Sequence, residues 1–136
     1  MGGPWFVKLL LDTHIWLWSL LEPERLSKRV TRALEDVQNE LWLSPVSTWE
    51  LVILVDKGRV VLDRAVDTWV SDNMKRIPFR EAPLTHEVAL ETHRVVLPHR
   101  DPADKFLVAT ANIFDLTLVT ADKRLIAAAR VNTLAN

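Results

Sequence analysis

The amino-acid sequence predicts an α/β fold in which a short parallel sheet is covered by helices on both faces. Short apolar segments of strand length alternate with segments of helical periodicity, as is typical of right-handed strand–helix–strand units. The composition, 49 % hydrophobic and 26 % charged residues, is that of a globular protein. The length of 136 residues predicts one domain over residues 1–136, with residues 1–6 as a leader or a cloning remnant.

The first elements are predicted from apolar runs and from the residues that end them. Val7–Leu11 is short and almost continuously apolar, as buried parallel strands are, and it ends at Asp12. A helix is expected over Thr13–Leu21, because Pro23 prevents its continuation. Ser27 is the predicted N-cap of a second helix.

The middle of the chain contains two further strand candidates. Leu41–Leu43 is the second predicted strand, and a helix over Val46–Lys57 follows and ends at Gly58. This helix is apolar on nearly every side, so we expect it to be substantially buried. Ala65–Arg76 has the spacing of an amphipathic helix, and Ile77–Ala82 is the third strand candidate.

The last third of the chain predicts three helices and a strand. Thr85 begins a helix that is expected to extend through Val96, before Pro98 ends it. The remaining predicted elements are a buried helix at Phe106–Phe114, a strand at Leu116–Thr120 and a helix from Asp122 through Ala129.

Composition and charge exclude several classes of function. The chain has no cysteine, so it has no disulfide, thiolate zinc site or iron–sulfur cluster, and a cytoplasmic location is expected. Its three glycines are too few for a dinucleotide fingerprint or a P-loop. The net charge of −1 excludes the coating of polyanions by bulk charge. No apolar run approaches the ~20 residues of a membrane span, so no membrane association is expected.

Four acidic residues lie where a parallel α/β sheet binds ligands, beyond the carboxyl ends of its strands. Asp12 and Asp122 each follow a predicted strand, Asp104 begins the helix that leads into one, and Glu50 lies on the helix that leaves another. Helix capping alone explains the three aspartates, and Asp101 before Pro102 likewise fits an N-cap. Capping does not explain a glutamate on an apolar helix.

A buried Glu50 must be protonated, paired with a basic side chain or bound to a cation, because an unpaired buried carboxylate costs several kcal/mol. Several carboxylates brought together at one sheet edge would repel one another unless a cation lies between them. An all-oxygen donor set favours Mg²⁺, and Mn²⁺ can substitute. Such an ion activates water and stabilises charge on a phosphoryl oxygen, so hydrolysis of phosphodiester bonds is the predicted chemistry.

Four segments carry these acids, namely LLDTH at residues 10–14, SPVSTWEL at 44–51, RDPADK at 100–105 and LVTAD at 118–122. In this order, and over most of the chain, they resemble the motifs of the PIN domains, specifically those of the VapC-like ribonuclease toxins. The resemblance implies a three-layer α/β/α fold and a Mg²⁺-dependent endoribonuclease that is the toxin of a toxin–antitoxin pair. It also implies an RNA substrate, an antitoxin partner and a homodimer.

The resemblance assigns the catalytic and metal-binding roles to Asp12, Glu50, Asp104 and Asp122. Thr13 and Thr120 match hydroxyls that orient carboxylates or metal-bound water in the family, although backbone capping explains them equally well. We interpret Asp101 as a helix cap or an outer residue of the same site. The candidates for RNA contact, chosen because they are close to the acids along the chain, are Arg100, Lys105, Lys123 and Arg124.

Two alternatives remain beside the nuclease. Phosphotransfer through Asp12 as nucleophile lacks the second nearby acid that Asp-x-Asp sites contain. A PIN-like module that binds RNA or protein without turnover is the other alternative, and an intact set of four acids argues against it. Among the tryptophans, Trp16, Trp49 and Trp69 are predicted to pack in the core, and Trp18 or Trp42 to serve a dimer or antitoxin interface.

Overall fold

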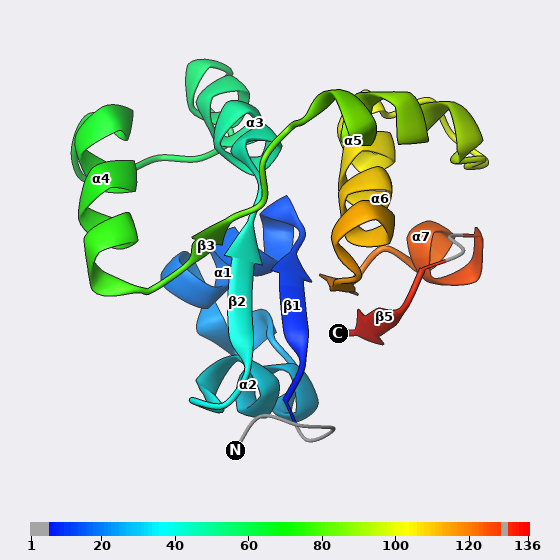
Figure 1. Ribbon diagram of the computed structural model, residues 1–136. Helices are drawn as coiled ribbons and strands as arrows, with labels where there is room; N and C mark the ends of the chain where they lie inside the picture. The colour runs from blue at the N-terminus through cyan, green and yellow to red at the C-terminus, as the bar shows by residue number, and fades with distance from the viewer. Residues whose placement is uncertain (1–5, 129–130) are drawn as a thin grey trace.

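The computed structural model describes residues 6–128 and 131–136, which form a three-layer α/β/α fold (Figure 1). Residues 1–5, which make up most of the predicted leader, and Ala129, the predicted last helical residue, lie outside the described part. Within it, the sheet is parallel and has the order β3-β2-β1-β4-β5. The strands are β1 (Lys8–Leu11), β2 (Glu40–Leu43), β3 (Arg80–Glu81), β4 (Thr117–Thr120) and β5 (Thr133–Ala135).

Helices cover both faces of this sheet. They are α1 (Thr13–Leu21), α2 (Lys28–Glu35), α3 (Pro45–Asp56), α4 (Val66–Arg76), α5 (His86–Glu91), α6 (Pro102–Phe114) and α7 (Lys123–Ala128). Side chains alternate along β1, so Leu9 and Leu11 face a core formed with α1 to α4. Leu10 faces a second core built mainly from α5 and α6. No helix in the described residues has the length and apolar character needed to cross a membrane.

The topology creates a crevice beside β1. The chain leaves β1 toward β2 on one side, and it returns later to form β4 on the other side. Since the strands are parallel, the segments that follow β1, β2 and β4 all start from one edge of the sheet. A position where the strand order diverges in this way is where open α/β sheets bind ligands.

Several predicted helix ends are confirmed. The Ser27 hydroxyl accepts a hydrogen bond from the backbone N–H of Val30 at 3.1 Å, which caps α2. Gly58 follows α3 with a φ of 68°, a left-handed conformation that glycine adopts without steric cost. Trp16 and Trp69 are buried as predicted, and their ring centroids lie 5.9 Å apart.

The helix predicted to run from Thr85 through Val96 is wrong at its C-terminal end. α5 ends at Glu91, and a single 3₁₀ turn over Thr92–Arg94 follows. Val95 then adopts an extended conformation and enters the core, whereas Val96 is 82 % exposed. Burial of Val95 therefore overrides the helical spacing, and the chain turns toward the loop that precedes α6.

The prediction that Val46–Lys57 is substantially buried holds only in part, since most of its residues are buried or half-buried and Trp49, Asp56 and Lys57 are exposed. In α3 only Val46, Ser47 and Leu51 are buried. Trp49, predicted to lie in the core, is 53 % exposed, because α3 lies at the margin of the fold and buries only part of its surface. The third strand is shorter than predicted, with only Arg80–Glu81 paired, and β5 was not identified from the sequence.

Candidate functional site

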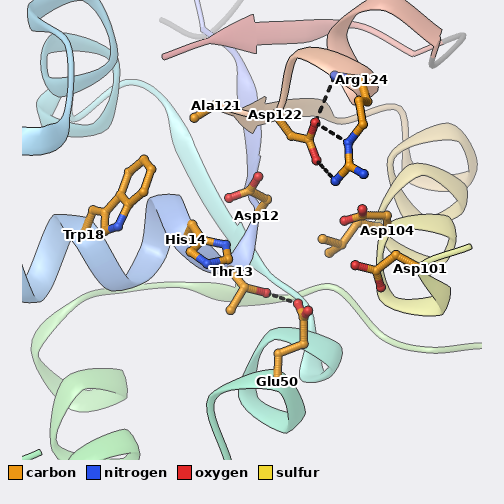
Figure 2. Close-up of a pocket in the computed structure, with 11 residues that line it drawn as sticks. Asp12, Thr13, His14, Trp18, Glu50, Asp101, Asp104, Ala121, Asp122 and Arg124 are labelled. Atoms are coloured by element: carbon orange, nitrogen blue, oxygen red, sulfur yellow. Dashed lines mark hydrogen bonds and ion pairs between the residues drawn. The ribbon is translucent and has the colours of Figure 1, made fainter. Parts of the chain in front are cut away.

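The four acids predicted to form a site lie around one pocket at the carboxyl edge of the sheet (Figure 2). Asp12 follows β1 and Asp122 follows β4, while Asp104 is in the first turn of α6 and Glu50 is on α3. The pocket has a volume of about 310 Å³. It is lined by Asp12, Thr13, His14, Trp18, Glu50, Asp101, Asp104, Leu107, Ala121, Asp122 and Arg124.

Asp12 is both a helix cap and the most deeply placed acid of the pocket. Its side chain accepts hydrogen bonds from the backbone N–H of Ile15 at 2.9 Å and from the hydroxyl of Thr120 at 2.5 Å. Asp12 is only 8 % exposed, and this burial raises the pKa of its carboxyl group despite the two hydrogen bonds. Capping and membership of the acidic pocket are therefore compatible.

Glu50 lies on the opposite side of the pocket and accepts a hydrogen bond from the hydroxyl of Thr13. The same Thr13 hydroxyl lies 3.0 Å from that of Ser47, which is fully buried. Partial burial raises the pKa of Glu50, and the negative charges of Asp101 and Asp104 add to this effect. Within residues 6–128 and 131–136 no basic side chain forms an ion pair with Glu50, so the structure does not support a structural salt bridge there.

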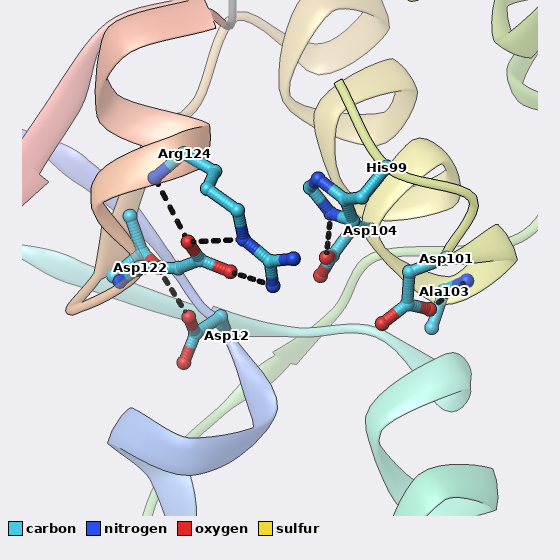
Figure 3. A network of polar contacts seen from close by, with 8 residues as sticks. Asp12, His99, Asp101, Ala103, Asp104, Asp122 and Arg124 are labelled. Carbon is cyan, nitrogen blue, oxygen red and sulfur yellow. Dashed lines mark hydrogen bonds and ion pairs between the residues drawn. The ribbon is translucent and has the colours of Figure 1, made fainter. Parts of the chain in front are cut away.

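Asp104 contacts a histidine to which the sequence analysis assigned no role. The Nε2 atom of His99 lies 2.6 Å from Oδ2 of Asp104 (Figure 3). Burial raises the pKa of Asp104, the hydrogen bond from His99 opposes this, and the nearby Asp101 and Asp122 raise the pKa further. The sequence offered one indication of this contact, because His99 lies only five residues before Asp104, in the loop that leads into α6.

Asp122 differs from the other three acids because it is paired with an arginine. Arg124 donates to Asp122 from its backbone N–H at 2.9 Å, from Nε at 3.2 Å and from Nη2 at 3.0 Å. These bonds lower the pKa of Asp122. Of the predicted RNA contacts, Arg124 lines the pocket, whereas Arg100, Lys105 and Lys123 are not among the residues that line it.

Asp101 lines the pocket and also caps α6, since its side chain accepts the backbone N–H of Ala103 at 3.0 Å. If capping is its main role, Asp101→Asn should leave stability, and the rate of the RNA cleavage expected from the sequence, nearly unchanged, because asparagine caps helices as well as aspartate does. Asp101→Ala should cost about 1 kcal/mol of stability. Urea denaturation and cleavage rates measure both effects. A large loss of cleavage in Asp101→Asn at unchanged stability would instead show that its charge serves the site.

The electrostatics of the pocket fit a divalent cation. Three of its carboxyl groups, those of Asp12, Glu50 and Asp104, have raised pKa values, because burial disfavours their charged forms. Among the described residues that line the pocket, Arg124 is the only arginine or lysine, and it is paired with Asp122. Carboxylate oxygens are the ligands that Mg²⁺ and Mn²⁺ prefer. A cation would therefore stabilise the charged forms of these three acids. Among the described residues, the ligand atoms that lie within 4.8 Å of one another are those of His99, Asp104 and Asp122.

A comparison with protein families defines the class of this protein. The family model of the PIN domain matches residues 9–131. The chain therefore belongs to the PIN-domain family, as its fold and its four acidic motifs predicted. More particularly, it is a homologue of Ribonuclease VapC22 of Mycobacterium tuberculosis. The two are 35 % identical over 120 residues, which cover 86 % of this chain and 88 % of that protein.

Solved structures share the fold. The FitAcB complex from Neisseria gonorrhoeae contains a chain that is 22 % identical, with a TM-score of 0.68 over 94 % of this chain and 96 % of that one. A chain of VapBC2 from Rickettsia felis, crystallised with a DNA fragment from its promoter, is 13 % identical. Its TM-score is 0.74, over 96 % of this chain and 99 % of that one. At these sequence identities, the comparison shows that the fold is shared.

Proposed function

We propose that this protein is a Mg²⁺-dependent endoribonuclease and the toxin of a toxin–antitoxin pair. The convergence of Asp12, Glu50, Asp104 and Asp122 on one pocket carries the proposal. A homologue that is a ribonuclease supports the choice of RNA among phosphodiester substrates. The alternative, a module that binds RNA or protein without turnover, has no need for several crowded carboxylates with raised pKa values.

The four acids are the proposed cation ligands and catalytic residues. When bound, Mg²⁺ or Mn²⁺ supplies an activated water and stabilises charge on the phosphoryl oxygen. The Thr120 hydroxyl donates a hydrogen bond to the carboxylate of Asp12, and the Thr13 hydroxyl donates one to that of Glu50. Both hydroxyls therefore restrict the orientation of an acidic side chain of the site. Asp12 and Glu50 come from different elements on either side of the pocket (Figure 2). Because Thr13 directly follows Asp12 in the chain, its hydrogen bond to Glu50 ties the two sides together.

The decisive test is RNA cleavage by the purified chain with and without divalent cation. Cleavage should require Mg²⁺ or Mn²⁺, stop in EDTA, and be lost in Glu50→Gln while circular dichroism shows an unchanged fold. The matched control is Glu87→Gln, an exposed glutamate of α5 outside the pocket, which should retain full activity. Tight RNA binding by the wild type without cleavage would support the non-catalytic module and contradict the nuclease.

The four basic residues Arg100, Lys105, Lys123 and Arg124 are the proposed contacts to RNA phosphates. Arg124 is the best placed, because it lines the pocket. Arg124→Ala should weaken the binding of a non-cleavable RNA to a similar extent for all RNA sequences. It should also reduce the slope of log K against log salt concentration by about one. Arg29→Ala is the control, since α2 lies at the other edge of the sheet (Figure 1). Equal salt slopes for both variants would exclude Arg124 as a phosphate contact.

A cognate antitoxin, a homodimer and a cytoplasmic location complete the proposal. Structures similar to this chain come from VapBC assemblies, which supports an antitoxin partner. Two tryptophans considered for an interface, Trp18 and Trp42, are only partly buried in this chain. Light scattering of the purified chain tests the dimer, and co-purification with the product of an adjacent gene tests the antitoxin.

A further inference from the structure

His99 has an unusual environment at the edge of the acidic pocket. Its side chain is 13 % exposed, and its Nε2 atom lies 2.6 Å from Oδ2 of Asp104, whose side chain is 15 % exposed (Figure 3). The other ring nitrogen, Nδ1, is buried and has no hydrogen-bond partner within the described residues. His99 therefore makes one strong polar contact, and that contact is to a proposed cation ligand.

When Asp104 is charged, its contact with His99 determines which ring nitrogen carries the proton. A charged carboxylate can only accept hydrogen bonds, so the contact requires a proton on Nε2. In the neutral ring Nδ1 then has a lone pair and no donor near it. A buried polar atom without a partner costs roughly 1–3 kcal/mol. The side chain tolerates this cost to keep Nε2–H on Asp104, whereas a histidine placed for stability alone is expected to use both nitrogens.

We propose that His99 is a positioning residue for the cation site. Its Nε2–H holds Oδ2 of Asp104 and leaves Oδ1 of the same carboxylate for the ion. This inference rests on the proposed function, because it concerns the site that would hold the cation. Restricting a ligand before the ion arrives raises affinity, and loss of such an outer contact typically costs 10–100-fold in metal affinity.

Direct coordination of the ion by His99 is the competing geometry. Ligand atoms of His99, Asp104 and Asp122 lie within 4.8 Å of one another. For Nε2 to bind a metal, however, the proton must move to Nδ1, and metal-bound histidines almost always donate that proton to a partner. No acceptor contacts Nδ1 among the described residues. The structure therefore favours the hydrogen bond to Asp104 over coordination.

Mn²⁺ binding, measured by calorimetry without RNA, tests the proposal. His99→Phe keeps a ring but removes the donor, so its affinity for Mn²⁺ should fall 10–100-fold. His99→Gln restores an N–H near the position of Nε2 and should recover most of the loss. His86→Phe, at an exposed histidine of α5, is the matched control and should bind as the wild type does. Equal affinities for wild type and His99→Phe would overturn the positioning role but leave the nuclease proposal intact.

A second measurement uses the unaltered protein and does not depend on the folding of any variant. ¹⁵N NMR of the protein with labelled histidine, at about pH 8, reports which ring nitrogen of His99 carries a proton. The proton should be on Nε2 of His99 and stay there when Mg²⁺ saturates the site. A shift of the proton to Nδ1 on adding Mg²⁺ would show direct coordination and overturn the proposal. If the wild type binds neither Mg²⁺ nor Mn²⁺, both this inference and the proposed function fail.

Discussion

Replacement of Asp12 by asparagine is expected to lower RNA cleavage by about 10³-fold or more, because it removes the negative charge of the most buried acid of the proposed cation site. The same change should stabilise the metal-free protein. The asparagine side chain can still accept the N–H of Ile15 and so keep the cap on α1. Cleavage assays in Mg²⁺ and thermal denaturation in EDTA at pH 7 measure the two effects on one variant.

The sign of the stability change follows from the raised pKa of Asp12. Since burial raises the pKa above that of the unfolded chain, the native state binds more protons than the unfolded state. Stability is therefore lost as the pH rises from the ordinary carboxyl range, about 4, through the raised pKa. At neutral pH the wild type carries this penalty and Asp12→Asn does not. A metal-free Asp12→Asn that melts below the wild type at pH 7 would show that the hydrogen bonds of the carboxylate, including the one from Thr120, stabilise the fold by more than its burial costs.

A suitable control replaces an aspartate outside the pocket. Asp115 is exposed at the end of α6 and has a φ of 55°, a conformation that asparagine also tolerates. Asp115→Asn should therefore change neither cleavage nor melting appreciably. A similar rise in melting temperature in both variants would mean that the stabilisation reflects net charge and not the acidic pocket.

Divalent cation is expected to stabilise the wild type strongly. At a concentration 100 times its Kd, a ligand of the native state adds about 2.7 kcal/mol. In a domain of this size that corresponds to a rise in Tm of roughly 10 °C. Mn²⁺ should produce this shift in the wild type and a much smaller one in Asp12→Asn. Differential scanning calorimetry with Mn²⁺, and with Na⁺ at equal ionic strength, makes the measurement.

The shift should also depend on pH in a defined direction. Burial raises the pKa values of Asp12, Glu50 and Asp104 in the metal-free protein, so protons compete with the ion for these oxygens. At a fixed Mn²⁺ concentration the rise in Tm should therefore be larger at about pH 7.5 than at about pH 5.5. A rise in Tm that is equal at the two pH values, or larger at the lower pH, would contradict competition between protons and the cation.

The parts of the fold that the sequence predicted are those set by local rules. The near-continuous apolar run that becomes β1 and the caps at Ser27 and Gly58 each act over a few residues. The convergence of the acids was also predictable, because parallel strands end at one edge of a sheet and each acid lies just beyond a strand or near the start of a helix.

The errors arose where packing between distant segments decides the outcome. Helical spacing predicted that the helix beginning at Thr85 runs through Val96. In the structure Val95 packs in the core in an extended conformation, and the helix ends earlier. The apolar character of α3 predicted substantial burial and placed Trp49 in the core, yet the position of α3 at the margin leaves Trp49 exposed. His99 escaped notice because its function depends on a side-chain contact with Asp104 that the loop creates. A local contact was also missed, because the sequence does not show whether the guanidinium of Arg124 faces Asp122, two residues away, or solvent.

Anomalous diffraction from crystals soaked in Mn²⁺ tests most directly whether the four acids hold a hard cation. The expected result is a peak in the pocket, coordinated by carboxylate oxygens that include those of Asp12 and Asp104, with no ion pair between Glu50 and a basic side chain of the described residues. The contradicting result is a pocket that holds no manganese at a concentration that saturates known Mn²⁺ enzymes, with Arg124 still paired to Asp122.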